Sequence, residues 1–354
     1  MTDSGFHTQA LPAAPTSPLA PGVVLPDGTR VVAYIGRSRG GESFVADSPV
    51  VGKLLLKLIA PEVEPFVEAN AEELSRLSQI QHRTIQRLYG VGRVADRSCF
   101  AYEFVEGQTL RSALDYRAAQ GARFSFRSIY NLLNHLANAL NTMHQVAPHG
   151  SLTSENIYVQ PDGRIRLVNI GYSHLTLLAR YRQPDVAESA SIAPELLDNP
   201  GAMSAASDFY AVGVLALTLL SGTHPTRETL LQLLDDVSAS YTAELRALLE
   251  ACLNPDPAHR IRHATEFRDA LARVAVSLQM AVRPPETTQS GAVPSVKSGS
   301  HPSIFTGTSN ERHATLRAAA VTGPLQVVNE ELRWVVQKLG RDFGPFPEAE
   351  VRRM

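Results

Sequence analysis

Two short stretches decide how this chain is interpreted: His149–Asn156, which reads HGSLTSEN, and Asn169–Gly171, which reads NIG. Between them, Pro161–Gly163 (PDG) is a turn sequence flanked by β-prone pieces, so both stretches are expected in loops beside short strands. Histidine, serine and asparagine side chains gather in these loops, whereas aspartate is missing from both. What the loops do depends on the domain that the rest of the sequence forms.

Length and composition limit the possible classes of protein. The 354 residues suffice for one domain of about 250 residues with tails, or for two smaller domains. The net charge of −2 provides no basic field, so nucleic acid is not an expected partner. Cys99 and Cys252 lack neighbours at metal-ligand spacing and are expected to be buried thiols in a reducing compartment. The N-terminus has no signal-peptide pattern, and the longest apolar run, Tyr210–Leu220, falls short of the ~20 residues of a membrane span. A cytoplasmic protein is expected.

Changes in composition divide the chain into five parts. The first 22 residues and the segment after residue 281 are rich in Pro, Ser, Thr, Ala or Gly without apolar periodicity. Such segments cannot bury enough apolar surface to offset their ordering entropy. The expected parts are a disordered leader (1–22), a strand-rich lobe (23–107), a helical lobe (108–281), a flexible linker (282–324), and a C-terminal amphipathic helix with a tail (325–354).

The strand-rich part is expected to contain five strands and one helix, and the next part several helices. The expected strands are Arg30–Ile35, Ser43–Ala46, Leu54–Ile59, Ile85–Arg93 and Cys99–Phe104. The expected helices are Pro61–Gln81, Ser128–Gln145, Asp208–Ser221, Glu228–Ser238, Tyr241–Leu253 and Ala264–Gln279.

A five-stranded lobe followed by a helical lobe, with an H-x-x-L-x-x-x-N loop at the junction, resembles the protein kinases over about Val23–Gln279. The resemblance is greatest to the bacterial Ser/Thr kinases of eukaryotic type. It implies an α+β, bilobal fold: a small N-lobe with a five-stranded antiparallel sheet and one helix, and a larger, mostly helical C-lobe. Each motif is weak alone, but their order and intervals are specific.

Several residues match the kinase scaffold. Lys57 stands where the family has the strand lysine that reaches the nucleotide phosphates, and Glu73 where it has the helix glutamate that pairs with this lysine; Glu72 is the alternative register. A solvent-facing lysine on a strand edge is the other interpretation of Lys57.

In the C-lobe, Ala193–Glu195 (APE) matches the end of the activation segment, and Arg260 matches the arginine that pairs with that glutamate. Asp208 matches the aspartate that braces the catalytic loop, while His149 and Ile170 match members of the hydrophobic spine. A buried charge is costly without its partner, so these matches imply an intact C-lobe.

The residues that differ from the family's pattern are at positions that carry out catalysis and bind metal. Ser151 replaces the catalytic-loop aspartate that accepts the substrate proton, a role worth roughly 10²–10⁴ in rate. Asn169 replaces the metal-binding aspartate, and Thr153 stands where the family often has a lysine. Asn156 matches the second magnesium ligand, although an asparagine in a tight loop also caps backbone groups.

The nucleotide cleft is altered as well. The glycine loop, Gly36–Ser43, keeps Gly36 and Gly41 of the family's pattern but has Ser38 and Ser43 in place of a glycine and a valine.

Larger side chains are expected on facing walls of the adenine slot. Leu55 replaces the alanine of the family's V-A-I-K, and Tyr158 aligns with the apolar floor of the slot. Two larger side chains facing one another in a slot for a flat purine should narrow or fill it.

No residue is therefore expected to work in catalysis, and no cofactor is expected. If ATP binds, the resemblance implies weak binding through Lys57, Glu73, Gly36, Gly41 and Asn156, with Asn156 as a poor ligand for magnesium.

The leading hypothesis is a pseudokinase that acts as a protein-binding or regulatory module in signalling. The alternative is a Ser/Thr kinase with residual or atypical ATP-dependent activity. The expected partners are proteins, with an active kinase or its substrate as candidates. The helix around Trp334 either docks on such a partner or packs on its own domain, and Ser189 and Ser191 are candidate phosphoacceptors.

Overall fold

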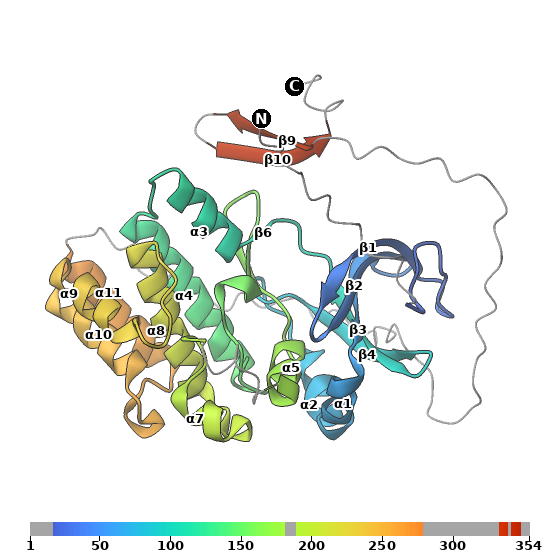
Figure 1. Ribbon diagram of the computed structural model, residues 1–354, viewed down its shortest axis with the longest axis horizontal. Coiled ribbons are helices and arrows are strands. Elements are labelled where there is room, and N and C mark those ends of the chain that lie inside the picture. The colour runs from blue at the N-terminus through green and yellow to red at the C-terminus, as the bar shows by residue number, and fades with distance from the viewer. Residues whose placement is uncertain (1–16, 181–188, 279–332, 339–340, 348–354) are drawn as a thin grey trace, which may run out of the picture.

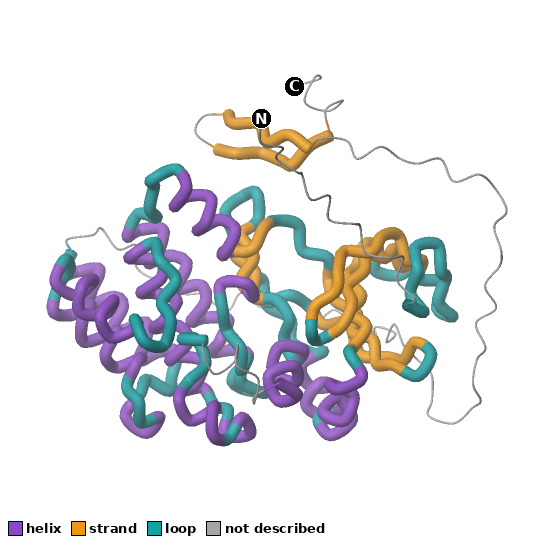
Figure 2. Tube along the Cα trace, in the orientation of Figure 1, coloured by secondary structure: helices purple, strands orange, loops and turns teal. Residues whose placement is uncertain are grey.

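The computed structural model describes residues 17–180, 189–278, 333–338 and 341–347 (Figure 1). The linker predicted over 282–324 and most of the predicted leader lie outside these ranges. Figure 2 shows the larger sheet at one end of the domain and a mainly helical region at the other, and this sheet has five strands. This is the α+β bilobal arrangement that the sequence predicted.

The N-lobe contains one antiparallel sheet with strand order β1-β2-β3-β5-β4. Alternation along β3 buries Leu54, Leu56 and Leu58 on one face, and places Leu55 and Lys57 on the other. All five predicted strands are present: β1 Arg30–Ser38, β2 Gly41–Ser48, β3 Gly52–Ile59, β4 Leu88–Val94 and β5 Arg97–Glu103.

The single helix predicted over Pro61–Gln81 is divided. It consists of the 3-10 turn Pro61–Val63 and the helices α1 (Glu64–Ala69) and α2 (Ala71–Leu77), with Asn70 between them. The side-chain amide of Asn70 donates to the carbonyl of Phe66 across 2.8 Å. Asparagine competes with helical backbone bonding in this way, which accounts for the break.

The C-lobe is built around α8 (Ala205–Ser221), whose residues from Ala206 to Leu220 are all buried. A helix that is apolar on every side is a central one. The other helices are α3 Leu110–Ala119, α4 Phe126–Met143, α5 Tyr172–Arg180, α7 Pro194–Asp198, α9 Leu230–Ala239, α10 Ala243–Leu253 and α11 Ala264–Ser277. A small sheet, β6 Gln108–Thr109, β7 Ile157–Val159 and β8 Ile165–Leu167, lies at the junction of the lobes, and 3-10 turns occur at Ser154–Asn156, Pro200–Ala202 and Pro257–His259.

The described end of the predicted leader is packed on the N-lobe. Leu19 is completely buried in the hydrophobic cluster that also contains Leu54, Leu56 and Leu58 of β3. The backbone N–H of Gly22 donates to the carbonyl of Val31 across 2.8 Å. The leader was therefore predicted too long at its C-terminal end, because one leucine in a Pro- and Ala-rich segment gives no periodic signal.

The C-terminal helix was predicted wrongly. In place of a helix around Trp334, the described residues form an antiparallel hairpin of β9 (Arg333–Lys338) and β10 (Arg341–Pro347). The segment RWVVQK is rich in β-branched and aromatic residues, which favour strands, and a short apolar run is ambiguous between the two structures. Within the described residues, no helix has the length and apolar character needed to cross a bilayer.

Candidate functional site

The loop His149–Asn156 is held from beneath by Asp208 at the start of α8. One carboxylate oxygen accepts from the N–H of His149 (2.7 Å) and the other from the N–H of Gly150 (2.9 Å). Burial opposes ionisation of Asp208, but the hydrogen bonds, first among them that with His144, hold its pKa below the usual value. The predicted bracing role of Asp208 is confirmed.

The two asparagines at the predicted metal positions are hydrogen-bonded to each other. Nδ2 of Asn169 donates to Oδ1 of Asn156 across 2.8 Å, and Nδ2 of Asn156 donates to the carbonyl of Ser151 across 2.7 Å. Asn169 has φ +64°, in the left-handed region that asparagine tolerates, and its N–H donates to Oε1 of the buried Gln86. Asn156 thus caps the loop backbone, the structural role that its residue type allowed.

This arrangement does not fit a magnesium ion. Mg²⁺ prefers anionic oxygens in octahedral geometry, whereas the cleft presents an amide N–H of Asn169 toward the amide oxygen of Asn156. In the part of the chain that the structure describes, no group of three or more His, Cys, Asp or Glu side chains could hold a metal ion.

Of the other two replacements in the loop, Thr153 makes a contact through its side chain and Ser151 through its backbone carbonyl. Ser151 is half-buried and offers its carbonyl to Asn156. Thr153 caps the 3-10 turn that follows, its Oγ1 accepting from the N–H of Glu155 at 3.3 Å. Neither side chain is a base at neutral pH, because an aliphatic hydroxyl does not ionise there.

Lys57 lies on β3 and faces an aromatic ring. Its Nζ is 4.3 Å from the ring centroid of Tyr172, the first residue of α5. Burial lowers the pKa of Lys57 to about 8. Among the described residues no carboxylate forms an ion pair with Lys57, so the Lys57–Glu73 pair that the resemblance implied is absent.

Glu73 lies beside α5 instead. Its Oε1 lies 3.5 Å from Nδ1 of His174, whereas Glu72 is exposed. The inward register of Glu73 was predicted correctly, but its partner was not. Tyr172 and His174 were missed as site residues; Tyr172, Leu175 and the apolar residues one turn further on are spaced as on a helix, and this was the available signal.

The glycine loop rests on the same helix. Ser38 and Gly41 pair across a tight turn, and Oγ of Ser38 lies 3.2 Å from Oη of Tyr172. Gly41 has φ +142°, and a Cβ there would lie 2.0 Å from a backbone oxygen of β3, so only glycine fits. Gly36 has open space around it. The two predicted nucleotide-contact glycines therefore differ, since only Gly41 is required by the strand pairing.

The two side chains predicted to fill the adenine slot lie on β3 and β7. Leu55 shares a face of β3 with Lys57 and packs on the core between the lobes. Tyr158 on β7 is half-buried, which raises the pKa of its phenol. The filling of the slot by these two side chains stays a prediction.

The predicted spine residues are all buried. Leu77, His149 and Ile170 have no exposed surface, and Leu77 and Ile170 belong to the hydrophobic core that spans both lobes, as does Leu88 of β4. The phenol of Tyr102 donates to the carbonyl of Ile170 across 2.7 Å. This contact fixes the backbone directly before α5.

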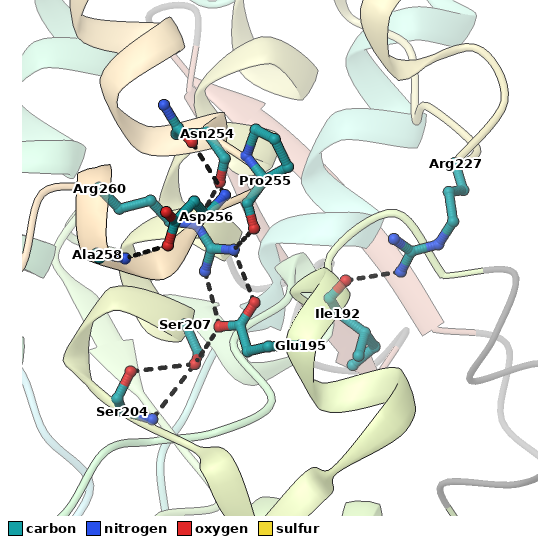
Figure 3. Close-up of polar contacts among 10 residues, drawn as sticks. All are labelled: Ile192, Glu195, Ser204, Ser207, Arg227, Asn254, Pro255, Asp256, Ala258 and Arg260. Carbon is teal, nitrogen blue, oxygen red and sulfur yellow. Dashed lines mark hydrogen bonds and ion pairs between the residues drawn. The ribbon is translucent and has the colours of Figure 1, made fainter.

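The predicted Glu195–Arg260 pair is confirmed and is drawn in Figure 3. The two terminal guanidinium nitrogens, Nη1 and Nη2, each donate to the carboxylate at 2.7 Å, and Ser207 donates to the same carboxylate at 2.8 Å. Burial opposes ionisation of Glu195, yet the hydrogen bonds from Arg260 and Ser207 hold its pKa below the usual value. The end of the activation segment is thereby fixed to the C-lobe.

The segment before this pair is held by Arg227. Its Nη2 donates to the carbonyls of Ser189 (2.8 Å) and Ile192 (2.7 Å), the second of which is visible in Figure 3. Ser189 and Ser191 are half-buried. Their role as phosphoacceptors stays a prediction.

Comparisons with known proteins agree with this fold. The family profile described as the protein kinase domain matches residues 48–271. The chain is 28% identical over 338 residues to serine/threonine-protein kinase pkn2 of Myxococcus xanthus, covering 86% of this chain but 39% of that protein. It is 24% identical over 325 residues to serine/threonine-protein kinase PknA of Mycobacterium tuberculosis, covering 85% and 74%. The crystal structure of the PknI kinase domain of Mycobacterium tuberculosis superposes with a TM-score of 0.60 at 24% identity, over 73% of this chain and all of that domain.

Proposed function

The chain belongs to the protein kinase family, and we propose that it is a pseudokinase: a kinase-shaped module that binds and regulates other proteins without efficient phosphoryl transfer. The hydrogen bond between Asn169 and Asn156 is the observation that carries this proposal. Kinases hold magnesium at these two positions, and the ions neutralise charge that develops on the transferred phosphoryl group. Two amides that satisfy each other supply neither a negative charge nor a free pair of ligands.

The loop chemistry supports the same proposal. Ser151 stands where the family has the aspartate that orients the substrate hydroxyl and accepts its proton, and its carbonyl is occupied by Asn156. General base catalysis contributes roughly 10²–10⁴ in rate, so its loss alone would leave little turnover. Lys57 has no carboxylate partner among the described residues, which supports weak or absent binding of ATP.

The scaffold suits a binding role. The Glu195–Arg260 pair and the Asp208 contacts keep the C-lobe and the end of the activation segment in place without serving chemistry. We propose a protein as the partner, with an active kinase or its substrate as the candidates. Ser189 and Ser191 would be acceptors for such an active kinase, and their half-buried position implies that the segment must loosen first.

A phosphotransfer assay with radiolabelled ATP and generic protein substrates tests the absence of activity. The wild-type chain should incorporate no more label than the Lys57→Ala variant. Turnover in the wild type that Lys57→Ala abolishes would overturn the proposal. The double variant Ser151→Asp/Asn169→Asp, which restores both family carboxylates, is the informative comparison, since any label it transfers shows that the assay detects activity on this scaffold.

A second candidate is a Ser/Thr kinase of residual activity. The observation in its favour is that Lys57 is retained and half-buried in the cleft, and the relatives are named as Ser/Thr kinases. Thermal shift with ATP and magnesium separates the candidates, because a ligand at 100 times its dissociation constant stabilises a protein by about 2.7 kcal/mol. A metal-dependent shift at millimolar ATP favours the kinase, whereas its absence favours the pseudokinase.

A further inference from the structure

We propose that α5 is a displaceable internal occupant of the cleft, in which Tyr172 covers Lys57 and a phosphate chain reaches that lysine only when α5 moves away. The proposal rests on the proposed function and deepens it, because it assigns a regulation to the same cleft. The ligand class is a polyphosphate, free or as part of a nucleotide, bound without a metal ion.

The first support is the contact at Lys57. Its ammonium lies 4.3 Å from the centroid of the Tyr172 ring, a cation–π distance, and no carboxylate of the described residues takes part. The ring is itself held, since Phe100 meets it edge-on with centroids 6.2 Å apart and only 8% of Tyr172 is exposed. A phosphate chain would have to replace this ring to reach the ammonium.

The second support is the glycine loop, which closes directly on α5. Oη of Tyr172 lies 3.2 Å from Oγ of Ser38. A Cβ at Gly40 would lie 2.4 Å from that Oη and 2.5 Å from Cγ2 of Thr176. The space beside Gly40 is thus filled by Tyr172 and Thr176 of α5, so the same helix lies against both Lys57 and the glycine loop.

The third support is the position of Glu73, which lies beside α5 and not beside Lys57 as in the family. Its carboxylate lies 3.5 Å from Nδ1 of His174, two residues after Tyr172. One short helix therefore contacts both groups that pair with each other in the family. Figure 1 shows α5 beside α1 and α2, the helices that carry Glu73 and its neighbours. Removal of α5 would free Lys57 and Glu73 together.

The helix has the features of an element that can move. It has nine residues, and helices shorter than about 12–15 residues are marginal without tertiary contacts. Hydrogen bonds hold Asn169 and the carbonyl of Ile170 in place, so the position at which the backbone can turn before α5 is Gly171, which has φ +73°. The contacts at Lys57, Ser38 and Glu73 hold α5 in the cleft together with the burial of Leu175 and Leu177 in the core.

Isothermal titration calorimetry of the full chain with ATP in EDTA tests the proposal. Tyr172→Ala should tighten binding by about tenfold or more relative to the wild type, since the competent state no longer has to be populated against the ring. Tyr172→Phe keeps the ring but loses the contact with Ser38, so its gain should be smaller. Tyr116→Ala, on the exposed side of α3, is the matched control and should bind like the wild type.

Two further experiments test whether Lys57 and the phosphates account for the gain in ATP affinity of Tyr172→Ala. The double variant Tyr172→Ala/Lys57→Met should lose the gain, and sodium tripolyphosphate should compete with ATP whereas adenosine should not. A gain that survives Lys57→Met, or competition by adenosine alone, would overturn the proposal.

Gly40→Ala keeps the proposal testable if Tyr172→Ala does not fold. The new Cβ overlaps Oη of Tyr172 and should push α5 outward, so ATP should again bind more tightly. ATP affinity no higher than that of the wild type in a folded Tyr172→Ala or Gly40→Ala variant would overturn the inference and leave the pseudokinase proposal standing. Conversely, turnover by the wild type in the radiolabel assay would overturn the proposed function. The ATP affinities of the variants would still test whether α5 blocks access to Lys57.

Discussion

Nδ2 of Asn169 donates a hydrogen bond to Oδ1 of Asn156 across 2.8 Å, so the two side chains at the family's metal positions satisfy each other. An aspartate at position 169 could not donate. In the present orientation of Asn156 it would place a carboxylate oxygen against an amide oxygen, a contact that a bound cation can relieve. The identity of this residue therefore decides whether the two side chains form a neutral hydrogen-bonded pair or present a negative charge that a metal ion could neutralise.

Asn169→Asp should lower the free energy of unfolding by about 1–3 kcal/mol, because the acceptor on Asn156 loses its donor. Millimolar magnesium should restore part of this loss in the variant and none in the wild type. Urea denaturation with and without magnesium measures both effects. Asn141→Asp, on an exposed position of α4, is the matched control and should respond to magnesium like the wild type. A variant as stable as the wild type would contradict the role assigned to this hydrogen bond.

Lys57 should make stability rise with pH in the alkaline range. Burial lowers its pKa from 10.5 to about 8 in the folded chain, whereas the unfolded chain keeps the proton up to about pH 10.5. Between these values the unfolded chain binds more protons, so the free energy of unfolding increases with pH.

The difference in free energy of unfolding between wild type and Lys57→Met should therefore grow from pH 8 toward 10.5 and stay constant below about pH 7. Chemical denaturation at a series of pH values measures it. Lys57→Arg should also lack the rise, because a guanidinium stays charged throughout this range. If the difference in free energy of unfolding between wild type and Lys57→Met does not change with pH, Lys57 titrates as an ordinary exposed lysine.

The bidentate pair of Arg260 and Glu195 should contribute strongly to stability. Arg260→Met leaves a carboxylate without its buried partner and should cost about 3–5 kcal/mol. The double variant Arg260→Met/Glu195→Leu should regain part of that loss, since no unpaired charge remains. Arg246→Met breaks an exposed contact with Glu250 and should change the denaturation midpoint little. Equal losses in the two arginine variants would contradict a special role for Arg260.

Motifs and local patterns predicted most of the fold. The five strands follow from β-prone runs bounded by turn residues, and the Glu195–Arg260 pair follows from two motifs at known intervals. The central helix follows from an apolar run whose ends are set by Ser204 and Gly222. These features depend on residues near each other in sequence or on a resemblance that fixes their partners.

What could not be predicted depends on competition between distant groups. Lys57 and Glu73 occupy their expected positions, yet each contacts α5 instead of the other, and no local pattern states which partner prevails. The hairpin around Trp334 was mistaken for a helix because apolar residues in a short run satisfy both periods. The break at Asn70 likewise depends on one side-chain hydrogen bond.

Gly150, in the loop His149–Asn156, should tolerate no side chain. It has φ +79°, and a Cβ there would lie 1.8 Å from Sδ of Met203. Gly150→Ala therefore combines the cost of a left-handed alanine, about 1–2 kcal/mol, with a steric clash. Gly222→Ala has a similar φ of +75° and no contact closer than 3.9 Å, so it measures the backbone cost alone.

The steric part is then isolated by a second comparison. Met203→Ala removes the side chain that the new Cβ meets, so Gly150→Ala/Met203→Ala should be destabilised, relative to Met203→Ala, by about as much as Gly222→Ala relative to the wild type. Gly150→Ala in the wild-type background should cost more than either. Thermal unfolding of the five proteins measures these differences. If Gly150→Ala costs no more than Gly222→Ala, then Met203 moves aside freely and the loop depends only on the backbone conformation of Gly150.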